Sequence, residues 1–433
     1  MGHIFKKHLM KVVKRICLWA LSPVALVAGL FFLLTGWFYI TCPIYSFDEP
    51  KPFSGTSFYN PYQTINVDTW KKCVFHLHSK SWLGLTNGEN SYEEMIEAYT
   101  QLNYDIIAVS DYMKISPQLI PVYEHGYNVK KTHQLAIGTQ KIMWRDYFFP
   151  QNLHQKQHII DMLKKRSRLV AVNHPTMSSG YRTDDFKYLS GYDLFEVQNG
   201  THLSEKAWDM ALSSGRPAWL IANDDAHSVR PERLQREVTF VNALIPDEES
   251  LASALDAVNT SLTPVFCEWP SVMSRLAQGV AFGVHFPRKK QATMDEKIEE
   301  TKVVSFPVSI QVQGDTLHIV WGQTMQQIDF IGDNGRLLKT VTGSDAAFYP
   351  VRPQDSYVRV KLTSTEGLVY YLNPIIRCDD NQPLIQAVSN IDKVKTFWKR
   401  AVITLFFGVI FLMFSTFLLS RRDFLRTYTK TTK

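Results

Sequence analysis

Cysteine is scarce in this chain. There are five cysteines in 433 residues, no two of them form a Cys-x-x-Cys pair, and one lies in a long apolar run. A zinc ribbon needs closely spaced cysteine pairs, so this kind of metal site is excluded, and the spacing defines no disulfide framework. The sequence also lacks internal repeats and low-complexity tracts, which excludes repeat architectures.

A basic stripe is missing as well. The formal net charge is +6, but much of the excess sits at the two ends of the chain, and the aromatic residues (13%) are spread along it. Proteins that bind nucleic acids usually gather Lys and Arg on one face, often with aromatic side chains between them. We therefore expect no nucleic-acid binding.

Charge is absent from two long runs, residues 17–40 and 401–420. About 20 apolar residues cross the hydrocarbon core of a bilayer, so each run predicts a transmembrane helix. A cleaved signal peptide is the alternative for the first run. Basic residues precede the first run and follow the second, which predicts a two-pass membrane protein with both termini cytoplasmic. The intervening domains are then extracytoplasmic, in the periplasm or at the cell surface, and the lipid bilayer is an expected partner.

The central region divides into two patterns. From residue 73, short continuous apolar strands alternate with helical stretches, which favours an enclosed parallel sheet. From residue 303, the period changes to two, which favours a small antiparallel β-sandwich. The expected segments are a basic tail (1–16), a transmembrane helix (17–40), a tether (41–72), a barrel (73–287), a linker (288–302), the β-sandwich (303–380), a second linker (381–400), a transmembrane helix (401–420) and a basic tail (421–433).

Polar side chains follow several of the predicted strands. His76 and His78 end the first strand and point to the same face, because side chains on a strand alternate. Asp225 and His227 repeat this spacing after a later strand. Asp111 and His174 also follow apolar strands. A (βα) barrel builds its active site at the carboxyl ends of its strands, so this series predicts a metal site there.

These motifs resemble those of the PHP (polymerase and histidinol phosphatase) family over about residues 73–270. The residues that carry the resemblance are His76-Leu77-His78, Ser110-Asp111-Tyr112, Gly138-Thr139-Gln140, His174-Pro175 and Asp224-Asp225-Ala226-His227. The resemblance implies a distorted (βα)7 barrel and a metal-dependent phosphoesterase. Together with the other patterns, the expected fold class is α/β: a PHP-type barrel plus a small antiparallel β-sandwich, flanked by two transmembrane helices.

The chain departs from the family pattern at several positions. Asn87 stands where the family has an Asp, Tyr112 where it has a His, and Gln140 where it has a carboxylate that bridges two metals. His154 is the nearest candidate for the histidine that follows this carboxylate. The losses imply a partly depleted metal site.

The resemblance implies that the remaining metal ligands are His76, His78, Asp225, His174 and His227. The first hypothesis is a hydrolase for a phosphoester substrate, with a divalent Zn, Mn or Fe ion, one rather than two, that activates water. His174 and His227 are then the catalytic residues, which stabilise charge or carry a proton. The second hypothesis is a catalytically degenerate PHP-like domain that serves as a binding or scaffold subunit for a membrane protein partner.

Overall fold

The computed structural model describes residues 23–24, 26–27, 29–31, 33–200, 202–243, 270–287, 289–379 and 389–431. The chain splits into two compact units, one formed by Met1–Ser46 with Asn390–Lys433 and one formed by Phe47–Ser389. The predicted basic tail 1–16, the first residues of the run 17–40 and residues 244–269 of the predicted barrel lie outside the described residues.

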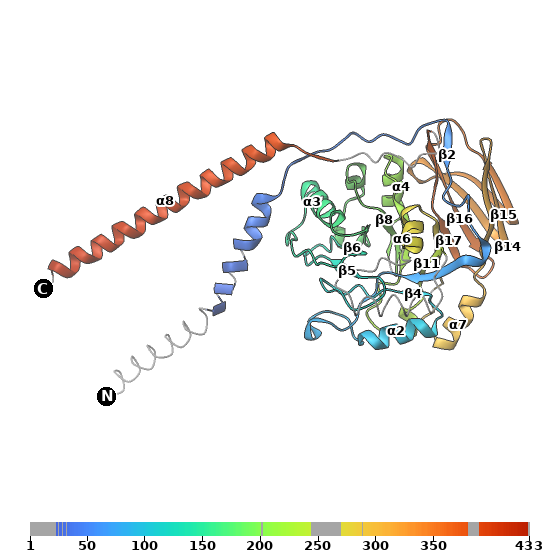
Figure 1. Cartoon of the computed structure of the whole chain (residues 1–433), viewed down its shortest axis with the longest axis horizontal. Coiled ribbons are helices and arrows are strands. Elements are labelled where there is room, and N and C mark those ends of the chain that lie inside the picture. The colour runs from blue at the N-terminus through green and yellow to red at the C-terminus, as the bar shows by residue number, and fades with distance from the viewer. Residues whose placement is uncertain are drawn as a thin grey trace. The chain divides into compact units, whose positions relative to one another are not determined.

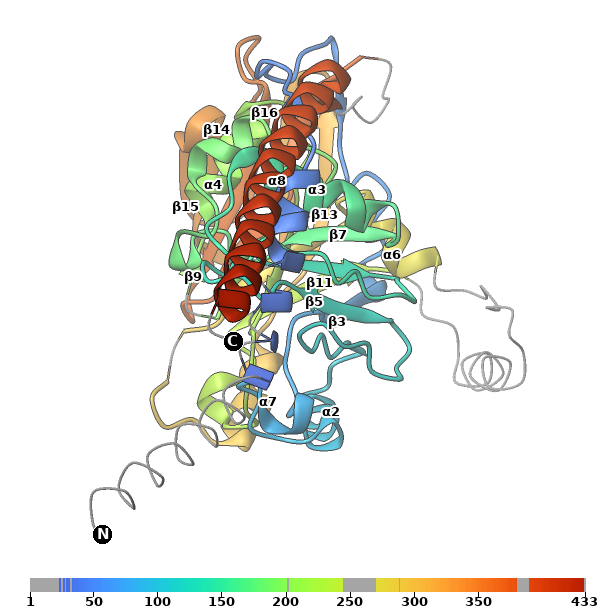
Figure 2. The ribbon, with the colours of Figure 1, turned by 90° about the vertical axis from the view of Figure 1, so that its left-hand side faces the viewer.

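The unit of the two chain ends is held by a strand pair. β1 (Tyr45–Ser46) pairs antiparallel with β19 (Asn390–Ile391), and α8 (Lys393–Thr431) follows as one unbroken helix (Figures 1 and 2). Lys399 Nζ donates to the carbonyl of Cys42, 2.9 Å away, just past the helical residues 33–41. A cation stabilises the carbonyl end of a helix, so this contact fastens α8 to the preceding helix.

The two predicted transmembrane helices are not found. Among the helical residues that the structure describes, none make up a helix with both the length and the apolar character that a bilayer crossing requires. The expected two-pass topology, with cytoplasmic termini and extracytoplasmic domains, is therefore wrong. The prediction rested on the absence of charge in each run, whereas a span needs length and sufficient apolar character in the same helix, and no helix among the described residues combines the two.

The Phe47–Ser389 unit contains two large sheets (Figure 1). One sheet has six strands in the order β10 (Trp219–Asn223), β8 (Leu194–Asn199), β7 (Leu169–Val172), β6 (Gln134–Ile137) and β5 (Val122–His125), with β9 (His202–Leu203) beside β8. The other has eleven strands, with the main order β13 (Pro307–Gln313), β14 (Thr316–Gly332), β16 (Tyr357–Ser364), β17 (Val369–Leu372), β12 (Ala281–His285), β11 (Glu237–Asn242), β3 (Trp70–Val74) and β4 (Ile106–Ile107). It is extended by β15 (Arg336–Pro350), β18 (Ile375–Cys378) and β2 (Ser57–Tyr59).

Helices connect and cover these strands. α2 begins after Ser91, because Ser91 and Glu94 form a reciprocal capping box at its first turn. The helices are α2 (Tyr92–Gln101), α3 (Leu153–Lys164), which contacts β6 and β7, α4 (Glu205–Ser213), which contacts β8, α6 (Pro270–Ala277) and α7 (Met294–Lys302). Short 3-10 helices lie at Val67–Thr69, Trp82–Gly84, Met177–Ser179, Thr183–Lys187, Pro231–Arg233 and Asp333–Gly335.

The predicted closed barrel is wrong, because the described strands form separate sheets and none of these closes. Between β10 and β11, the Thr239 hydroxyl bonds to the backbone N–H (2.8 Å) and carbonyl (2.7 Å) of Ala222 in place of a strand ladder. After β4, a single bridge joins Tyr112 to Glu124 of β5. Side-chain and single-residue bridges replace the continuous backbone pairing that a barrel needs.

The expected all-parallel arrangement is also wrong. β5, β6 and β7 pair antiparallel, whereas β7, β8 and β10 pair parallel. Only eight residues (126–133) connect β5 to β6, and a connection of this length suits a hairpin but not a parallel crossover.

The predicted β-sandwich is not a separate body. Its alternating strands are present, but β17 pairs antiparallel with β12, so they continue the sheet that contains β11 and β3. The period-two pattern identified the strands correctly. The same pattern does not indicate which strand from elsewhere in the chain pairs with the edge of the sheet that they form.

A shared hydrophobic core holds this continuous sheet together. It includes Val74 and Leu77 next to the first histidine motif, and Phe282, Trp321 and Tyr370 from the later strands. The residues of the first histidine motif therefore sit directly on the core.

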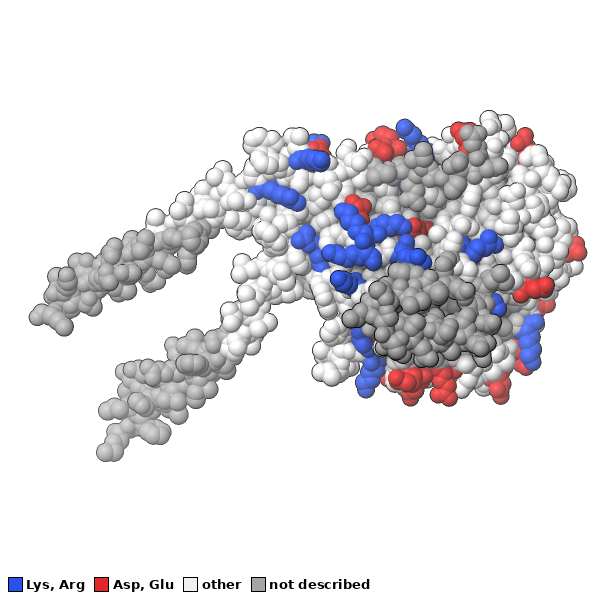
Figure 3. Space-filling view, viewed as in Figure 1, with Lys and Arg blue, Asp and Glu red and all other residues white. Residues whose placement is uncertain are grey.

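Figure 3 shows basic side chains in the middle of one face and acidic side chains along its lower edge, where Figure 1 places α2.

Candidate metal centre

The two histidine-containing motifs lie side by side. Leu77 and Ala226 form a parallel bridge, the His78 N–H donates to the carbonyl of Ala226 (2.8 Å), and the Asp225 N–H donates to the carbonyl of His76 (3.1 Å). The alternation that the sequence predicts therefore turns His76, His78 and Asp225 toward one point. Backbone hydrogen bonds fix the chain at these residues, so their side chains do not project from a flexible loop.

His76 and His78 face the same two carboxylates. His76 Nε2 lies 3.2 Å from Glu124 Oε1 and 3.3 Å from Asp225 Oδ1, and His78 Nε2 lies 3.2 Å from Glu124 Oε2 and 3.1 Å from Asp225 Oδ1. The geometry of these contacts is not that of hydrogen bonds, and both Nε2 atoms, Glu124 Oε2 and Asp225 Oδ1 are buried without a partner among the described residues. Buried lone pairs that converge in this way are stabilised by positive charge between them, and their donor atoms are those that a divalent cation binds.

Glu124 is the centre of this cluster, and the sequence analysis missed it. Its Oε1 lies 3.0 Å from His133 Nδ1 and 3.0 Å from His174 Nε2, and its side chain is fully buried. Glu124 lies within β5 and His133 directly precedes β6, so the hairpin of these strands carries both residues. An acidic residue inside the run Val122–His125 was the available signal.

Glu196 orients two of the histidines from behind. Its Oε1 accepts from His76 Nδ1 (2.9 Å), and its Oε2 accepts from the backbone N–H of His174 (2.8 Å). The amides of Asn199 and Asn223 also donate to it, at 2.8 and 3.0 Å. Because Nδ1 of His76 carries the hydrogen, Nε2 presents its lone pair to the centre, as a metal ligand requires.

Two of the candidate ligands have a left-handed backbone. His174 has φ of 25° and Asp225 has φ of 50°. Residues other than Gly are uncommon in this region, although Asn, Asp and His enter it more readily than other side chains, and such residues concentrate at functional sites because the surrounding structure must hold them. The strain at these two positions supports a functional role for the cluster.

Electrostatics in the cluster favour a positive charge. Burial opposes protonation of His76, but the charges of Asp225, Glu196 and Glu124 outweigh it and hold its pKa well above the ordinary value. Burial opposes protonation of His78 as well, but the adjacent carboxylates of Asp225 and Glu124 raise its pKa to about 9. The carboxylates thus attract protons where a divalent cation fits equally well.

His227 lies at the edge of the cluster. Its Nδ1–H donates to the carbonyl of Asp225 (2.8 Å), and its ring centroid is 4.5 Å from that of His78. The Tyr112 ring also stacks on His78, with centroids 4.3 Å apart and an angle of 14° between the rings, and it lies 6.4 Å from the ring of His227. The lone pair of His227 Nε2 is therefore available beside the predicted ligands.

Other residues singled out in the sequence lie elsewhere. Asp111 accepts from the backbone and hydroxyl of Ser79 (2.7 and 2.8 Å), and Gln140 is exposed after β6. His154 stacks on Phe47 with centroids 5.4 Å apart. His154, the nearest candidate for a histidine of the site, is therefore not in the cluster, which instead contains the carboxylate of Glu124 and the imidazole of His133.

The described residues contain two groups that could hold a metal ion, His76 with Glu124 and His174, and His76 with His78 and Asp225. They share His76, which has only Nε2 to offer because Nδ1 is bonded to Glu196. The donor set of imidazole nitrogens and carboxylate oxygens suits Zn, Mn or Fe. The residues present therefore fit a divalent metal, and all five ligands predicted from the sequence lie in or beside this cluster.

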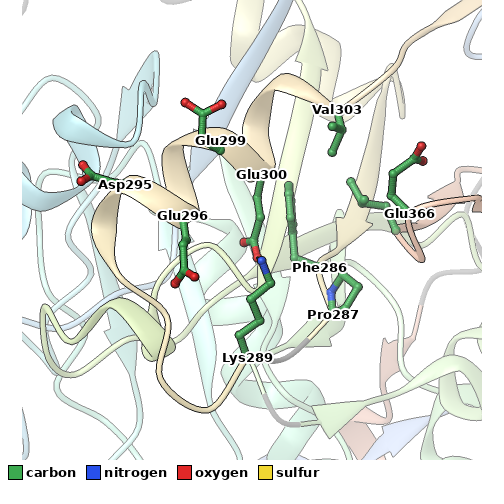
Figure 4. Close-up of a pocket in the computed structure, with 10 residues that line it drawn as sticks. Phe286, Pro287, Lys289, Asp295, Glu296, Glu299, Glu300, Val303 and Glu366 are labelled. Carbon is green, nitrogen blue, oxygen red and sulfur yellow. The ribbon is translucent and has the colours of Figure 1, made fainter.

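A separate hollow of about 460 Å³ lies beside α7 (Figure 4). Its acidic side chains are already engaged: Glu300 lies 3.0 Å from Lys289 Nζ and 3.1 Å from Lys297 Nζ, and Glu296 caps α7 through the N–H of Thr293 (2.8 Å). These pairs make it a solvated helix face and not a second metal centre.

No protein-family model matches the chain, and no curated protein matches it. A solved structure that resembles it comes from Bacteroides vulgatus and is described as a two-domain protein containing a "predicted PHP-like metal-dependent phosphoesterase". The two chains are 16% identical, the alignment covers 76% of this chain and 99% of the other, and the TM-score is 0.37.

Proposed function

We propose that this chain is a metal-dependent phosphoester hydrolase. The observation that carries the proposal is the convergence of His76, His78 and Asp225 on Glu124, with lone pairs that are buried and have no hydrogen-bond partner among the described residues. Such a centre costs free energy unless a cation occupies it.

A bound divalent metal supplies a water of lowered pKa and draws electron density from a phosphoryl oxygen. The protein's own residues prepare this chemistry. Glu196 holds the lone pair of His76 Nε2 inward, and Glu124 and Asp225 balance the charge of the cation. Because these groups are held by strands and backbone hydrogen bonds, little reorganisation is needed during the reaction.

His227 is the candidate for proton transfer. Burial is the largest cause that lowers the pKa of His227, to about 4, so the ring is neutral near pH 7. Its Nδ1–H is bonded to the Asp225 carbonyl, which leaves Nε2 to accept the proton of the attacking water and return it to the leaving oxygen. His174, bonded to Glu124, acts as a ligand or as a charge-stabilising group.

Glu124 also bears on the alternative of a degenerate binding subunit. That hypothesis rested on the loss of metal-binding groups at three positions, Asn87, Tyr112 and Gln140. Glu124 supplies a carboxylate between His76 and His174, and His133 adds a further imidazole. These residues favour the hydrolase.

The test is hydrolysis of a panel of phosphomonoesters and phosphodiesters by the full chain loaded with Zn, Mn or Fe. We expect turnover that a chelator removes and that His76→Ala/His78→Ala lacks. A folded, metal-loaded protein without turnover on any member of the panel would overturn the proposal.

A further inference from the structure

Four large apolar side chains stand exposed beside the candidate metal centre. We name this set the apolar rim: Trp82, Leu83, Leu85 and Trp144. Leu83 and Leu85 are 103% and 88% exposed, and the two tryptophans are about half exposed. Contact of such side chains with water is unfavourable, and a group of them beside a polar site is typical of a binding surface.

One half of the apolar rim is attached to His78. The indole N–H of Trp82 donates to the carbonyl of Tyr112 (2.7 Å), and the Tyr112 ring stacks on His78 at 4.3 Å. The turn Trp82–Gly84 follows His78 by only a few residues. The indole is therefore fixed to the backbone of the residue whose ring stacks on a candidate ligand.

The other half is attached to β5 on both sides of Glu124. The Tyr123 hydroxyl accepts from the N–H of Met143 (2.9 Å), and His125 Nε2 donates to the carbonyl of Arg145 (2.9 Å). These two bonds place Trp144 so that its ring meets Trp82 edge to face, with centroids 6.0 Å apart. The segments that carry His78 and Glu124 thus also carry the rim.

The backbone of the rim has an unfavourable conformation that keeps its side chains exposed. Trp82 and Leu83 are consecutive residues with φ of 52° and 55°. A left-handed conformation is unfavourable for both residue types, and a more extended turn would relieve it. The turn instead holds Leu83 and Leu85 outward, although neither gains contacts within the chain.

We infer that the apolar rim binds the alkyl chain of an amphipathic phosphoester whose head group lies at the metal centre. This inference rests on the proposed function in that it places a phosphoester head group there. It adds the substrate class: a phosphate ester of a long-chain alcohol, bound as a single molecule.

The size and shape of the rim favour an alkyl chain over other occupants. Four side chains of this kind offer a few hundred Å², whereas a stable protein interface needs about 800 Å² from each partner. The edge-to-face contact of the two indoles leaves no slot for a flat ring between them. Two exposed leucines beside them present an aliphatic surface that a flexible chain can follow.

The test is calorimetric titration of the metal-loaded full chain with n-alkylphosphonates of increasing length, each below its micelle concentration. We expect Kd to fall by about two- to fourfold for each methylene that the rim covers. Leu83→Ser/Leu85→Ser should flatten this dependence and leave the Kd of methylphosphonate unchanged. Val308→Ser, which removes an exposed apolar side chain from β13, is the matched control and should behave like the wild type.

Three outcomes would overturn the inference: a Kd independent of chain length, equal flattening in the Val308→Ser control, or a dimer that Leu83→Ser/Leu85→Ser dissolves, which would assign the rim to a second copy of the chain. Binding to phospholipid vesicles without binding to monomeric alkylphosphonates would overturn it as well. Phosphonates are not hydrolysed, so a chain-length dependence without turnover of any phosphoester would reject the proposed function alone.

Discussion

Glu196 Oε1 lies 2.9 Å from Nδ1 of His76, and both side chains are fully buried. The carboxylate fixes the tautomer of the ring, so that Nε2 faces Glu124 and Asp225 with its lone pair. It is a positioning residue, because it acts on the metal centre through His76.

Glu196→Gln should weaken metal binding by about 10- to 100-fold, because an amide cannot accept all the hydrogen bonds that the carboxylate accepts. Competition with a metal-binding dye measures this. Asp193→Asn is the matched control: Asp193 precedes the same strand but accepts from the N–H of Val170 (2.9 Å), away from the histidines. Equal weakening in both variants would mean that Glu196 supports only the strand.

Glu124→Gln and Gln140→Ala test which position serves the metal centre: Glu124, as the structure indicates, or Gln140, as the sequence indicated. Glu124 contacts four histidines, whereas Gln140 is exposed. Glu124→Gln should reduce both metal content and phosphoester hydrolysis by more than about 100-fold. Gln140→Ala should leave both unchanged. The reverse pattern would show that the family carboxylate position is indeed at Gln140.

The buried carboxyl group of Glu237 should make the free energy of unfolding depend on pH. Burial raises its pKa to about 7, although the hydrogen bond from His285 (2.7 Å) opposes the shift. A carboxyl group with a raised folded-state pKa binds more protons in the folded state, so its contribution to stability is full below the unfolded-state pKa and is lost as the pH rises. Relative to Glu237→Gln, the free energy of unfolding should fall by up to about 1.4 kcal/mol per pH unit between about pH 4.5 and 7.

Urea unfolding of the wild type and Glu237→Gln at several pH values, both with chelator, measures this difference. The histidine cluster is common to both proteins, so its titration cancels. A constant or rising difference over this pH range would contradict the account of Glu237.

Arg359 ties the late strands to α4. Its Nε and one terminal nitrogen contact the two carboxylate oxygens of Asp209 at 2.7 and 2.8 Å, and the pair is buried. Arg359→Met leaves that carboxylate buried without its partner and should destabilise the protein by about 3–5 kcal/mol. Arg230→Ala, which breaks an exposed pair with Glu89, should cost only about 0–1 kcal/mol.

Thermal and urea unfolding compare these variants. The double change Arg359→Met/Asp209→Leu should recover most of the loss, because no charge then remains buried without a partner. A double variant as unstable as Arg359→Met alone would show that packing and not charge dominates at this contact.

The candidate site could be predicted only in part. His76, His78 and Asp225 could be predicted, because alternation on a strand and position after a strand are local properties of the sequence. Glu124 and Glu196 were not, because they lie inside strands, where a carboxylate is tolerated only through partners distant in sequence. The expectation that site residues follow the carboxyl ends of parallel strands also misses residues on an antiparallel hairpin such as β5–β6. The direction of these strands depends on which strands they pair with.

The fold shows the same division. The capped helix after Ser91 and most strands follow from local pattern. Sheet closure and the pairing of β12 with β17 depend on how distant segments meet, and a membrane span needs length and apolar character in one helix. Local periodicity contains neither kind of information.

The most direct test of the account is the metal content of the purified full chain beside that of His76→Ala/His78→Ala, by elemental analysis. The account predicts about one or more divalent transition-metal ions per chain in the wild type and their loss in the variant, with both proteins folded by circular dichroism. A folded wild type that neither retains a metal nor takes one up from solution would contradict it.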